Sequence, residues 1–375
     1  MRIFLDLRTV RPGMTGVGIA AHLVWDALLS QPCEGEVAGL FLKSCAPPAS
    51  SDPHVTLIET GVDYESHPRG DLWFHMRLPR IAGGWGADVF HGAAFQIPWL
   101  PTPFAKTVSI HDMIAFRHPG TMPFRFRNYL RFVTRLSARS SDRIVTCSGA
   151  TACDIAEILS VDTSKIDVVP LYPRPVFRPV SPDESDSASR FPKEIRKPFI
   201  LCAGTLEHRK NQELLVRAFG YLTHKGAKGC QLILAGGRGD GFDGIAAAIR
   251  DSGASNDIII VERPDDSLLR TLYCRAELFV LPSLYEGFGL TLLEAMACGA
   301  PVLHSDAASL PEVAGGAGAA FISGNLESLV QAMDGLLRDK ARRSAMRSRS
   351  LSRAAEFTPE RTAVLLWNAY ARAVK

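Results

Sequence analysis

The sequence predicts an α/β protein made of two doubly wound domains, each with a parallel sheet flanked by helices. The first observation is that short apolar runs alternate with longer helical patterns along the chain, which is typical of this architecture. The second is the length of 375 residues, which indicates two or more domains. The third is a polar stretch at residues 179–197, after which the alternation starts again. A stretch of this composition predicts a linker.

The predicted strands are short runs of apolar residues. In chain order they occupy residues 3–7, 37–42, 108–110, 144–147, 199–203, 232–235, 258–261, 278–281 and 301–304. The linker at 179–197 separates an N-terminal domain over residues 1–178 from a second domain over residues 198–358. Because doubly wound sheets bind ligands at the carboxyl ends of their strands, we expect the ligand in a cleft at those ends.

Composition and charge exclude several classes of protein. The chain is 46% hydrophobic, so each half can bury a core, and a net charge of +3 excludes a globally basic nucleic-acid binder. The eight cysteines lack CxxC or metal-ligand spacing, which indicates reduced thiols in a cytoplasmic protein. Residues 1–7 predict a strand rather than a signal peptide, and no apolar stretch approaches the length of about 18 residues that spans a membrane.

The block at residues 281–302 (LPSLYEGFGLTLLEAMACGAPV) is the most informative part of the chain. If the segment between Glu286 and Glu294 is mostly helical, a rise of about 1.5 Å per residue separates the carboxylates by roughly 12 Å. That is about the distance from a ribose to a hexose across a diphosphate. Gly287 and Gly289 leave backbone N–H groups uncovered at a helix N-terminus, where a phosphate binds well. The block therefore predicts a sugar-nucleotide site.

The alternative is an ordinary strand-to-helix connection with two solvated glutamates. Glu294 favours the site, because its neighbours are apolar and a buried carboxylate needs a partner, which ligand hydroxyls would supply.

A second candidate group follows the first strand of the second half, in residues 203–211 (AGTLEHRKN). Arg209 and Lys210 stand at a predicted helix start, where cations are disfavoured unless an anion is present. A planar guanidinium beside a lysine ammonium can neutralise a diphosphate. The alternative is a solvated pair of cations.

Together with residues 111–119 (HDMIAFRHP), these blocks resemble the Glu-x7-Glu signature of the retaining glycosyltransferases of family GT4, which have the GT-B fold. The resemblance covers nearly the whole chain. It implies two Rossmann-like domains facing across a cleft and a C-terminal helix, over residues 359–375, that crosses back to the N-terminal domain. It also implies retention by same-face attack with a phosphate oxygen as the base, and neither a metal nor another cofactor.

The resemblance also implies roles for individual residues. Glu294 would hold the ribose and Glu286 the donor hexose, while Arg209 and Lys210 would stabilise the leaving diphosphate. The substrate-binding backbone would comprise Gly16, Gly204, Gly287, Phe288, Gly289 and Leu290. His111 and Asp112 would contact the transferred sugar or the acceptor; the alternative is a core histidine bonded to its neighbouring aspartate.

The blocks look most like those of bacterial mannosyltransferases of O-antigen and exopolysaccharide assembly. We therefore expect GDP-mannose as the donor, with UDP-glucose or another UDP-hexose as the alternative. The acceptor would be a growing glycan on a polyprenyl-diphosphate or other lipid carrier.

A basic stripe is the last feature. Arg127, Arg131, Arg135 and Arg139 recur every four residues beside an apolar helical face that includes Phe126, Tyr129, Leu130, Val133 and Leu136, and residues 113–141 contain no acidic residue. A basic amphipathic helix predicts contact with anionic lipid at the inner face of the cytoplasmic membrane. The alternative is a solvated face over a core-packed helix.

Rival functions are weaker. No Asp-x-Asp occurs, which argues against a metal-bridged donor site of the GT-A type. A glycosidase needs two carboxyls about 5–10 Å apart, closer than the helical value above. A GT-B sugar-nucleotide epimerase or a non-catalytic sugar-nucleotide-binding protein remain as alternatives.

Overall fold

A computed structural model describes the whole chain except residues 31–34, 46, 48–49, 64–69, 181–190, 197 and 227–228. Most of the predicted linker over 179–197 therefore lies outside the described residues. The chain divides into two compact units. Unit 1 comprises Met1–Pro119, Pro123–Tyr172 and Phe357–Lys375, and unit 2 comprises Gly120–Met122 and Pro173–Glu356.

Unit 1 contains a seven-stranded parallel sheet in the order β3-β2-β1-β4-β5-β6-β7. Its strands are β1 (Arg2–Asp6), β2 (Glu36–Leu42), β3 (Val55–Thr60), β4 (Val89–Gly92), β5 (Ala105–Ser109), β6 (Arg143–Thr146) and β7 (Ile166–Val168). The order reverses between β1 and β4, and such a switch point leaves a crevice at the carboxyl ends of the strands.

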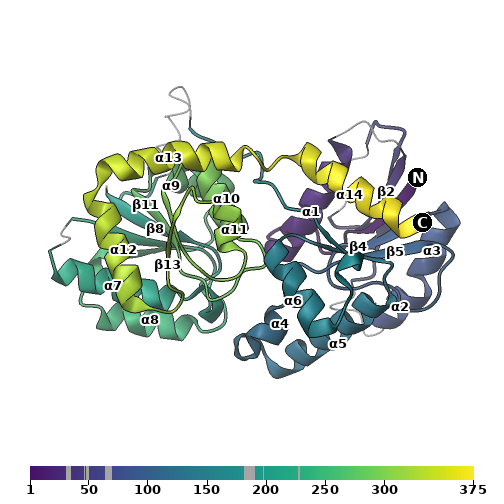
Figure 1. Cartoon of the computed structure of the whole chain (residues 1–375), viewed down its shortest axis with the longest axis horizontal. Helices are drawn as coiled ribbons and strands as arrows, with labels where there is room; N and C mark the ends of the chain where they lie inside the picture. Colours follow the sequence, from purple (N-terminus) through teal and green to yellow (C-terminus); the bar gives the residue numbers. More distant parts are fainter. Residues whose placement is uncertain are drawn as a thin grey trace. The chain divides into compact units, whose positions relative to one another are not determined.

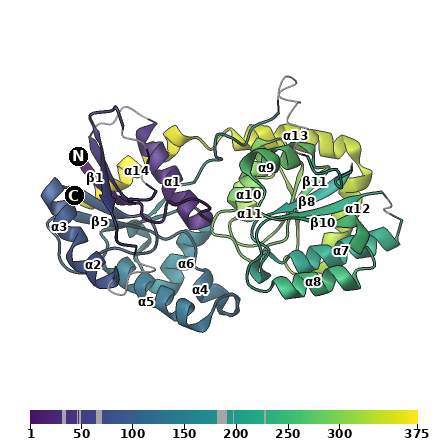
Figure 2. The same cartoon turned by 180° about the vertical axis from the view of Figure 1, so that it is seen from behind.

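The helices of unit 1 cover both faces of this sheet. They are α1 (Gly16–Leu29), α2 (Gly70–Met76), α3 (Leu78–Trp85), α4 (Ile114–Arg117), α5 (Phe124–Ser140), α6 (Gly149–Leu159) and α14 (Pro359–Val374). Figures 1 and 2 show α1 and α14 on one side of the sheet and α4, α5 and α6 on the other.

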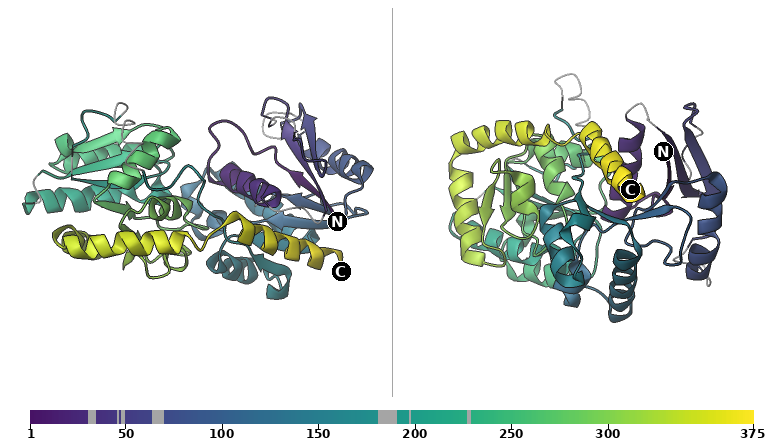
Figure 3. Two further views of the ribbon diagram at one scale, coloured as in Figure 1. Left: turned by 90° about the horizontal axis from the view of Figure 1, so that it is seen from above. Right: turned by 45° about the vertical axis from the view of Figure 1, so that its right-hand side comes forward.

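The C-terminal helix α14 packs against the unit 1 sheet, as expected from the resemblance. It begins after Thr358, whose side chain accepts a hydrogen bond from the backbone N–H of Arg361. Thr362 donates to the carbonyl of Pro170 at 2.8 Å, and the hydroxyl of Tyr370 is 2.7 Å from Nδ1 of His91. The last helix of the chain therefore packs on the sheet of the first unit (Figure 3).

Unit 2 contains a six-stranded parallel sheet in the order β10-β9-β8-β11-β12-β13. Its strands are β8 (Phe199–Ala203), β9 (Gln231–Ala235), β10 (Ile258–Val261), β11 (Leu278–Leu281), β12 (Val302–Ser305) and β13 (Ala319–Phe321). Its helices are α7 (Gln212–His224), α8 (Phe242–Asp251), α9 (Asp266–Arg275), α10 (Leu290–Ala297), α11 (Leu310–Ala314), α12 (Leu326–Arg338) and α13 (Lys340–Ala354). The switch point lies between β8 and β11.

The predicted fold class of two doubly wound parallel sheets is confirmed. The strands that the apolar runs did not predict include β3, β7 and β13, and each of them is the edge strand of its sheet. An edge strand is less completely covered than a central one: β3 has no fully buried residue, while β7 and β13 are three residues long. Polar residues interrupt the sequences of β3 and β7, so these two strands leave no continuous apolar run.

Candidate functional site

The loop after β11 brings Glu286 against the cations that follow β8. Arg209 Nη1 donates to Glu286 Oε2 at 2.9 Å, and the ammonium of Lys210 pairs with Oε1. Lys210 is the last residue of a short 3₁₀ helix at the carboxyl end of β8, beside the switch point of the unit 2 sheet. The anion that the sequence required beside these cations is therefore supplied by the chain itself.

Glu286 is buried and ionised. Burial by itself raises the pKa of a carboxyl group, but here Lys210 and Arg209, with a hydrogen bond from Ser283, lower the pKa of Glu286 to about 2. Two cations share this one carboxylate, although Arg209 also pairs with Glu207. With Glu207 included, the two cations are matched by two carboxylates, so the cluster carries no net charge.

Three buried serines fix the position of the Glu286 loop. Ser283 Oγ donates to Glu286 Oε1 at 2.7 Å. Ser305 Oγ, at the end of β12, donates to the carbonyl of Ser283 at 2.6 Å, and Ser309 Oγ donates to the carbonyl of Glu286 at 2.9 Å. Both backbone and side chain of the acidic loop are therefore held by hydrogen bonds within unit 2.

Glu294 lies inside α10 and is 2% exposed. The sequence predicted ligand hydroxyls as its partner, and the structure adds a partner within the chain: Arg174 Nε donates to Glu294 Oε1 at 2.8 Å. The same guanidinium binds Asp266 at the start of α9 and lies 4.6 Å from the ring of Phe177. Burial, which Arg174 opposes, nevertheless raises the pKa of Glu294 to about 7. This carboxylate is thus far more easily protonated than Glu286.

The helical geometry behind the expected distance between the two carboxylates holds only in part. The value of about 12 Å assumed that most of the segment is helical, whereas α10 begins at Leu290 and residues 286–289 are not helical. Gly289 caps the helix with φ +94°, and a Cβ there would lie 2.6 Å from Leu310 Cδ2. Glycine is therefore required both by backbone conformation and by space.

The first turn of α10 has no side-chain cap among the described residues. Lys210 Nζ lies near this first turn. A Cβ built on Gly204 would be 3.7 Å from Lys210 Nζ and 3.9 Å from Thr291 Cγ2, and Thr291 belongs to the turn. Phe288 is buried, while Gly287 and Leu290 are half-buried. A helix N-terminus beside a lysine ammonium provides backbone N–H donors and positive charge for an anion such as a phosphate.

In unit 1, His111 and Asp112 follow the carboxyl end of β5. His111 Nε2 is 2.7 Å from the carbonyl of Ala93, and the neighbouring Asp112 acts on the ring electrostatically. Burial lowers the pKa of His111, and a neutral ring that donates from Nε2 leaves Nδ1 as an acceptor. Asp112 Oδ1 accepts from the backbone N–H of Ile114 at 3.0 Å.

Two other residues of unit 1, the buried His91 and the sequence candidate Gly16, have simple structural settings. Both ring nitrogens of the fully buried His91 are engaged, by Tyr370 and by Ser109. Gly16, which opens α1, has open space where a Cβ would be. The glycine that sterics require in the first turn of α1 is Gly18, where a Cβ would lie 2.7 Å from the carbonyl oxygen of Thr9.

The arginines of the predicted stripe fall into two groups, hydrogen-bonded and exposed. Arg127 donates to the carbonyl of Pro119 and Arg131 to that of Ala115, whereas Arg135 and Arg139 are exposed. The predicted apolar face is also partly wrong. Val133 is buried and Leu130 and Leu136 are half-buried, but Phe126 and Tyr129 point away from the core and are exposed.

The residues that sequence reasoning missed are Arg174, Ser283, Ser305 and Ser309. Ser283 had one available signal, because it lies three residues before Glu286 in the block already singled out. Arg174 had none, because it stands 120 residues from Glu294 in the sequence.

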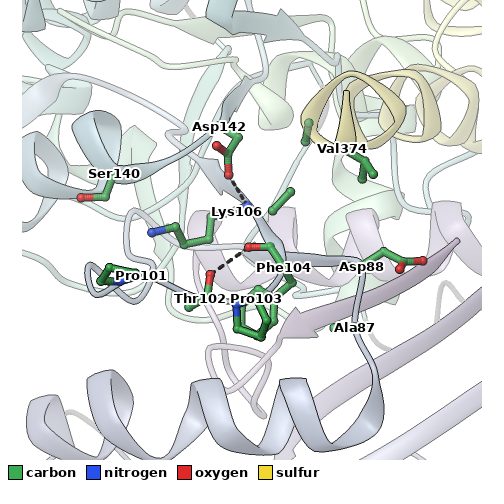
Figure 4. A pocket seen from close by; sticks show the side chains of 12 residues that line it. Ala87, Asp88, Pro101, Thr102, Pro103, Phe104, Lys106, Ser140, Asp142 and Val374 are labelled. Carbon is green, nitrogen blue, oxygen red and sulfur yellow. Dashed lines mark hydrogen bonds between the residues drawn. The ribbon is translucent and has the colours of Figure 1, made fainter.

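A hollow of about 470 Å³ lies elsewhere in unit 1 (Figure 4). Its walls include Asp88, Ala105 and Asp142, next to the amino ends of β4, β5 and β6. Ligands of doubly wound sheets bind at the opposite edge, so this hollow is not the candidate site. Within the described residues there is no group of three or more His, Cys, Asp or Glu side chains that could hold a metal ion. No helix in the described ranges is long and apolar enough to cross a membrane.

Comparison with known proteins links both units to one group of enzymes. The family described as Glycosyltransferase Family 4 matches residues 38–171, and the family described as Glycosyl transferases group 1 matches residues 184–353. O-antigen chain mannosyltransferase B of Escherichia coli is 30% identical over 305 residues, which are 81% of this chain and 77% of that protein. The serotype-specific mannosyltransferase WbdA of the same organism is 29% identical over 74% of this chain, but that match spans 34% of WbdA.

Solved structures share the fold. Sucrose-phosphate synthase from Thermosynechococcus elongatus has a TM-score of 0.79 at 20% identity, covering 99% of this chain and 98% of that one. Anabaena HepE, solved in complex with UDP and glucose, has a TM-score of 0.75 at 15% identity, covering 99% of both chains.

Proposed function

The chain belongs to the family 4 (GT4) glycosyltransferases with the GT-B fold, and from that premise we propose that it transfers mannose from GDP-mannose to a lipid-linked or growing glycan acceptor in surface polysaccharide synthesis. The transfer proceeds with retention and without a metal or other cofactor in this proposal. The observation that carries it is the cluster of Glu286, Arg209 and Lys210 beside the uncapped first turn of α10.

On the donor side, Glu294 accepts hydrogen bonds from the ribose hydroxyls and Glu286 from hydroxyls of the donor hexose. Backbone N–H groups of Gly287, Phe288, Gly289 and Leu290 face the phosphates, and Gly204 leaves room for the diphosphate next to Lys210. A carboxylate fixed by two cations and a serine is already oriented for these contacts, so little order is lost when the donor binds.

Arg209 and Lys210 offset the charge that develops on the leaving diphosphate. That charge is larger in the transition state than in the bound donor, so the attraction lowers the barrier to transfer rather than merely tightening binding. The acceptor hydroxyl attacks from the face that the nucleotide leaves, and a phosphate oxygen of the leaving group takes its proton.

On the acceptor side, His111 and Asp112 contact the transferred sugar or the acceptor, and Gly16 approaches the diphosphate or the acceptor. The neutral ring of His111 offers Nδ1 as an acceptor for a sugar hydroxyl. This arrangement suits orientation of an uncharged sugar, because the ring brings no charge of its own.

The choice of mannose is supported by the printed activities of the Escherichia coli relatives, which are mannosyltransferases. UDP-glucose or another UDP-hexose is the second candidate, because Anabaena HepE has been solved with UDP-glucose. Neither an epimerase nor a non-catalytic sugar-nucleotide binder accounts better for the paired carboxylates and cations.

We place the enzyme in the cytoplasm, on the inner face of the cytoplasmic membrane, where a lipid carrier presents its glycan. Support comes from α5, whose Arg127, Arg131, Arg135 and Arg139 were predicted to face anionic lipid and of which Arg135 and Arg139 are exposed.

The test is a thermal-shift panel of GDP, UDP, GDP-mannose, UDP-glucose and UDP-GlcNAc, without metal, on the wild type and on Glu294→Ala. A ligand at 100 times its dissociation constant stabilises the fold by about 2.7 kcal/mol. The proposal expects a GDP-selective shift that Glu294→Ala abolishes, followed by mannose transfer that EDTA does not inhibit. A UDP-selective shift overturns the donor, and no shift with any nucleotide overturns the donor site.

A further inference from the structure

Helix α5 exposes its large aromatic side chains and buries its small ones. Its buried residues are Val133, Thr134, Ser137 and Ala138, whereas Phe124 is 68% and Phe132 is 56% exposed. In the part of the chain that the structure describes, the exposed phenylalanines are Phe124, Phe126 and Phe132, all on this helix. Aromatic side chains that stay in water do not contribute the free energy gained on burial. Their exposure on α5 therefore indicates that a partner covers them.

The apolar surface continues beyond α5. The Trp99 ring lies 5.7 Å from the Phe132 ring, edge to face, and 4.0 Å from the His75 ring on α2, so ring contacts join α2, the loop at 99–100 and α5. Figures 1 and 2 show α2 and α5 on the same side of the unit 1 sheet. We call the resulting surface the aromatic face; its exposed apolar members are Leu72, Met76, Leu100, Phe124, Phe126, Tyr129 and Phe132.

The charge around the aromatic face is strongly positive. Residues 72–141 contain nine lysines and arginines against two acidic residues, although the net charge of the whole chain is only +3. Arg125, Arg135 and Arg139 are exposed on α5, and Arg77 and Arg80 are exposed beside α2. The partner that fits these charges is anionic.

We propose that the aromatic face inserts into the interface of an anionic phospholipid bilayer. Its aromatic and aliphatic side chains enter the boundary between headgroups and acyl chains, and the exposed arginines bind the headgroup phosphates. The biological role of this insertion rests on the proposed function, because an enzyme bound to the membrane is close to a lipid-linked acceptor. It goes beyond the arginine stripe because the apolar side chains, from three segments, carry the insertion.

The test is flotation of the purified protein with vesicles of phosphatidylcholine alone or mixed with phosphatidylglycerol. We expect binding to the anionic vesicles, with the affinity lowered at least about tenfold by Phe126→Ser with Phe132→Ser through the loss of buried apolar area. Arg135→Ala with Arg139→Ala lowers it about 30-fold and weakens the preference for anionic lipid, at about 1 kcal/mol per arginine. Ile322→Ser, an apolar residue 58% exposed in unit 2, is the matched control and leaves binding unchanged.

Unchanged binding of the Phe126→Ser, Phe132→Ser variant overturns the proposal. Binding of the wild type that added salt abolishes completely also overturns it. Either result would mean that the surface binds lipid by charge alone, without insertion. A wild-type dimer that this variant dissociates, measured by sedimentation, assigns the face to a second copy instead. The melting temperature of each variant confirms that it is folded. Because the vesicles carry neither donor nor acceptor, the result does not depend on the donor proposal.

Discussion

Glu286 and Glu294 are eight residues apart and both are buried, yet their pKa values move in opposite directions. The pKa of Glu286 falls to about 2 because Lys210 and Arg209 outweigh its burial, whereas the pKa of Glu294 rises to about 7 because burial outweighs Arg174. The difference shows that the number of cations around a buried carboxylate, rather than its burial, sets its charge.

The local structure explains this difference. Glu286 stands on the loop after the central strand β11, where Lys210 and Arg209 reach it from the segment that follows the neighbouring strand β8. Glu294 stands inside α10, where its one described cationic partner, Arg174, is shared with Asp266. The first carboxylate is a fixed anion near neutral pH, and the second is a group that titrates.

The largest expected effect comes from removing the fixed anion. Glu286→Gln leaves Lys210 and Arg209 without their buried partner, which costs about 3–5 kcal/mol of folding free energy. We also expect kcat/KM to fall roughly 100-fold or more, because the hydroxyls of the donor hexose lose the charged carboxylate to which they donate hydrogen bonds. Denaturant unfolding and a transfer assay measure these effects. Glu207→Gln, which removes the other partner of Arg209, is the control and changes kcat/KM less than tenfold.

The next effect is on the pH dependence of stability. Folded Glu294 keeps its proton to about pH 7, while the unfolded group releases it near 4.5. Between these values the folded chain holds the extra proton, so the free energy of unfolding falls as pH rises, by at most about 3 kcal/mol. Glu286 acts oppositely, and its contribution is lost as pH falls from 4.5 towards 2.

Denaturant titrations at pH 5 and pH 7 compare the wild type with Glu294→Gln. From pH 5 to pH 7, the free energy of unfolding should fall less in Glu294→Gln than in the wild type, because glutamine has no proton to release at this position. Equal pH dependence in the two proteins contradicts the assignment of the raised pKa.

A smaller effect comes from Arg174→Ala. Without the guanidinium, the pKa of Glu294 rises further, and nucleotide affinity at pH 7 falls about tenfold as the carboxylate takes up a proton. Affinity measured against pH separates this from general damage, because the loss is recovered at higher pH. Arg174→Lys keeps the charge and retains most of the affinity; pH-independent loss in Arg174→Ala counts against the prediction.

The smallest effect is expected from Ser283→Ala. Removing one buried hydrogen bond costs about 1 kcal/mol and raises the pKa of Glu286, so the acid limb of the pH–rate profile moves to higher pH. Ser309→Ala, which releases the backbone carbonyl of Glu286, leaves that limb in place. Identical pH profiles for the two variants would show that Ser283 acts on the backbone as well.

Sequence reasoning predicted the donor-side candidates because Glu286 and Glu294 lie in one block and Arg209 and Lys210 in another, each at a strand end. It could not predict Arg174, because nothing in the sequence around that residue points to a partner 120 positions away. It misassigned the apolar face of α5 because helical periodicity shows which side chains share a face, but not whether that face meets the core or the solvent.

The packing of α14 on unit 1 has a consequence for how the protein is made. Ala363, Leu366 and Tyr370 are buried against a sheet whose strands are synthesised first, while the helix is among the last parts of the chain to leave the ribosome. The strands of unit 1 must therefore wait, with this surface uncovered, until all of unit 2 has emerged. Unit 2 needs no such delay, because its strands and helices are consecutive in the chain. A nascent chain of this protein should thus close its second unit before its first.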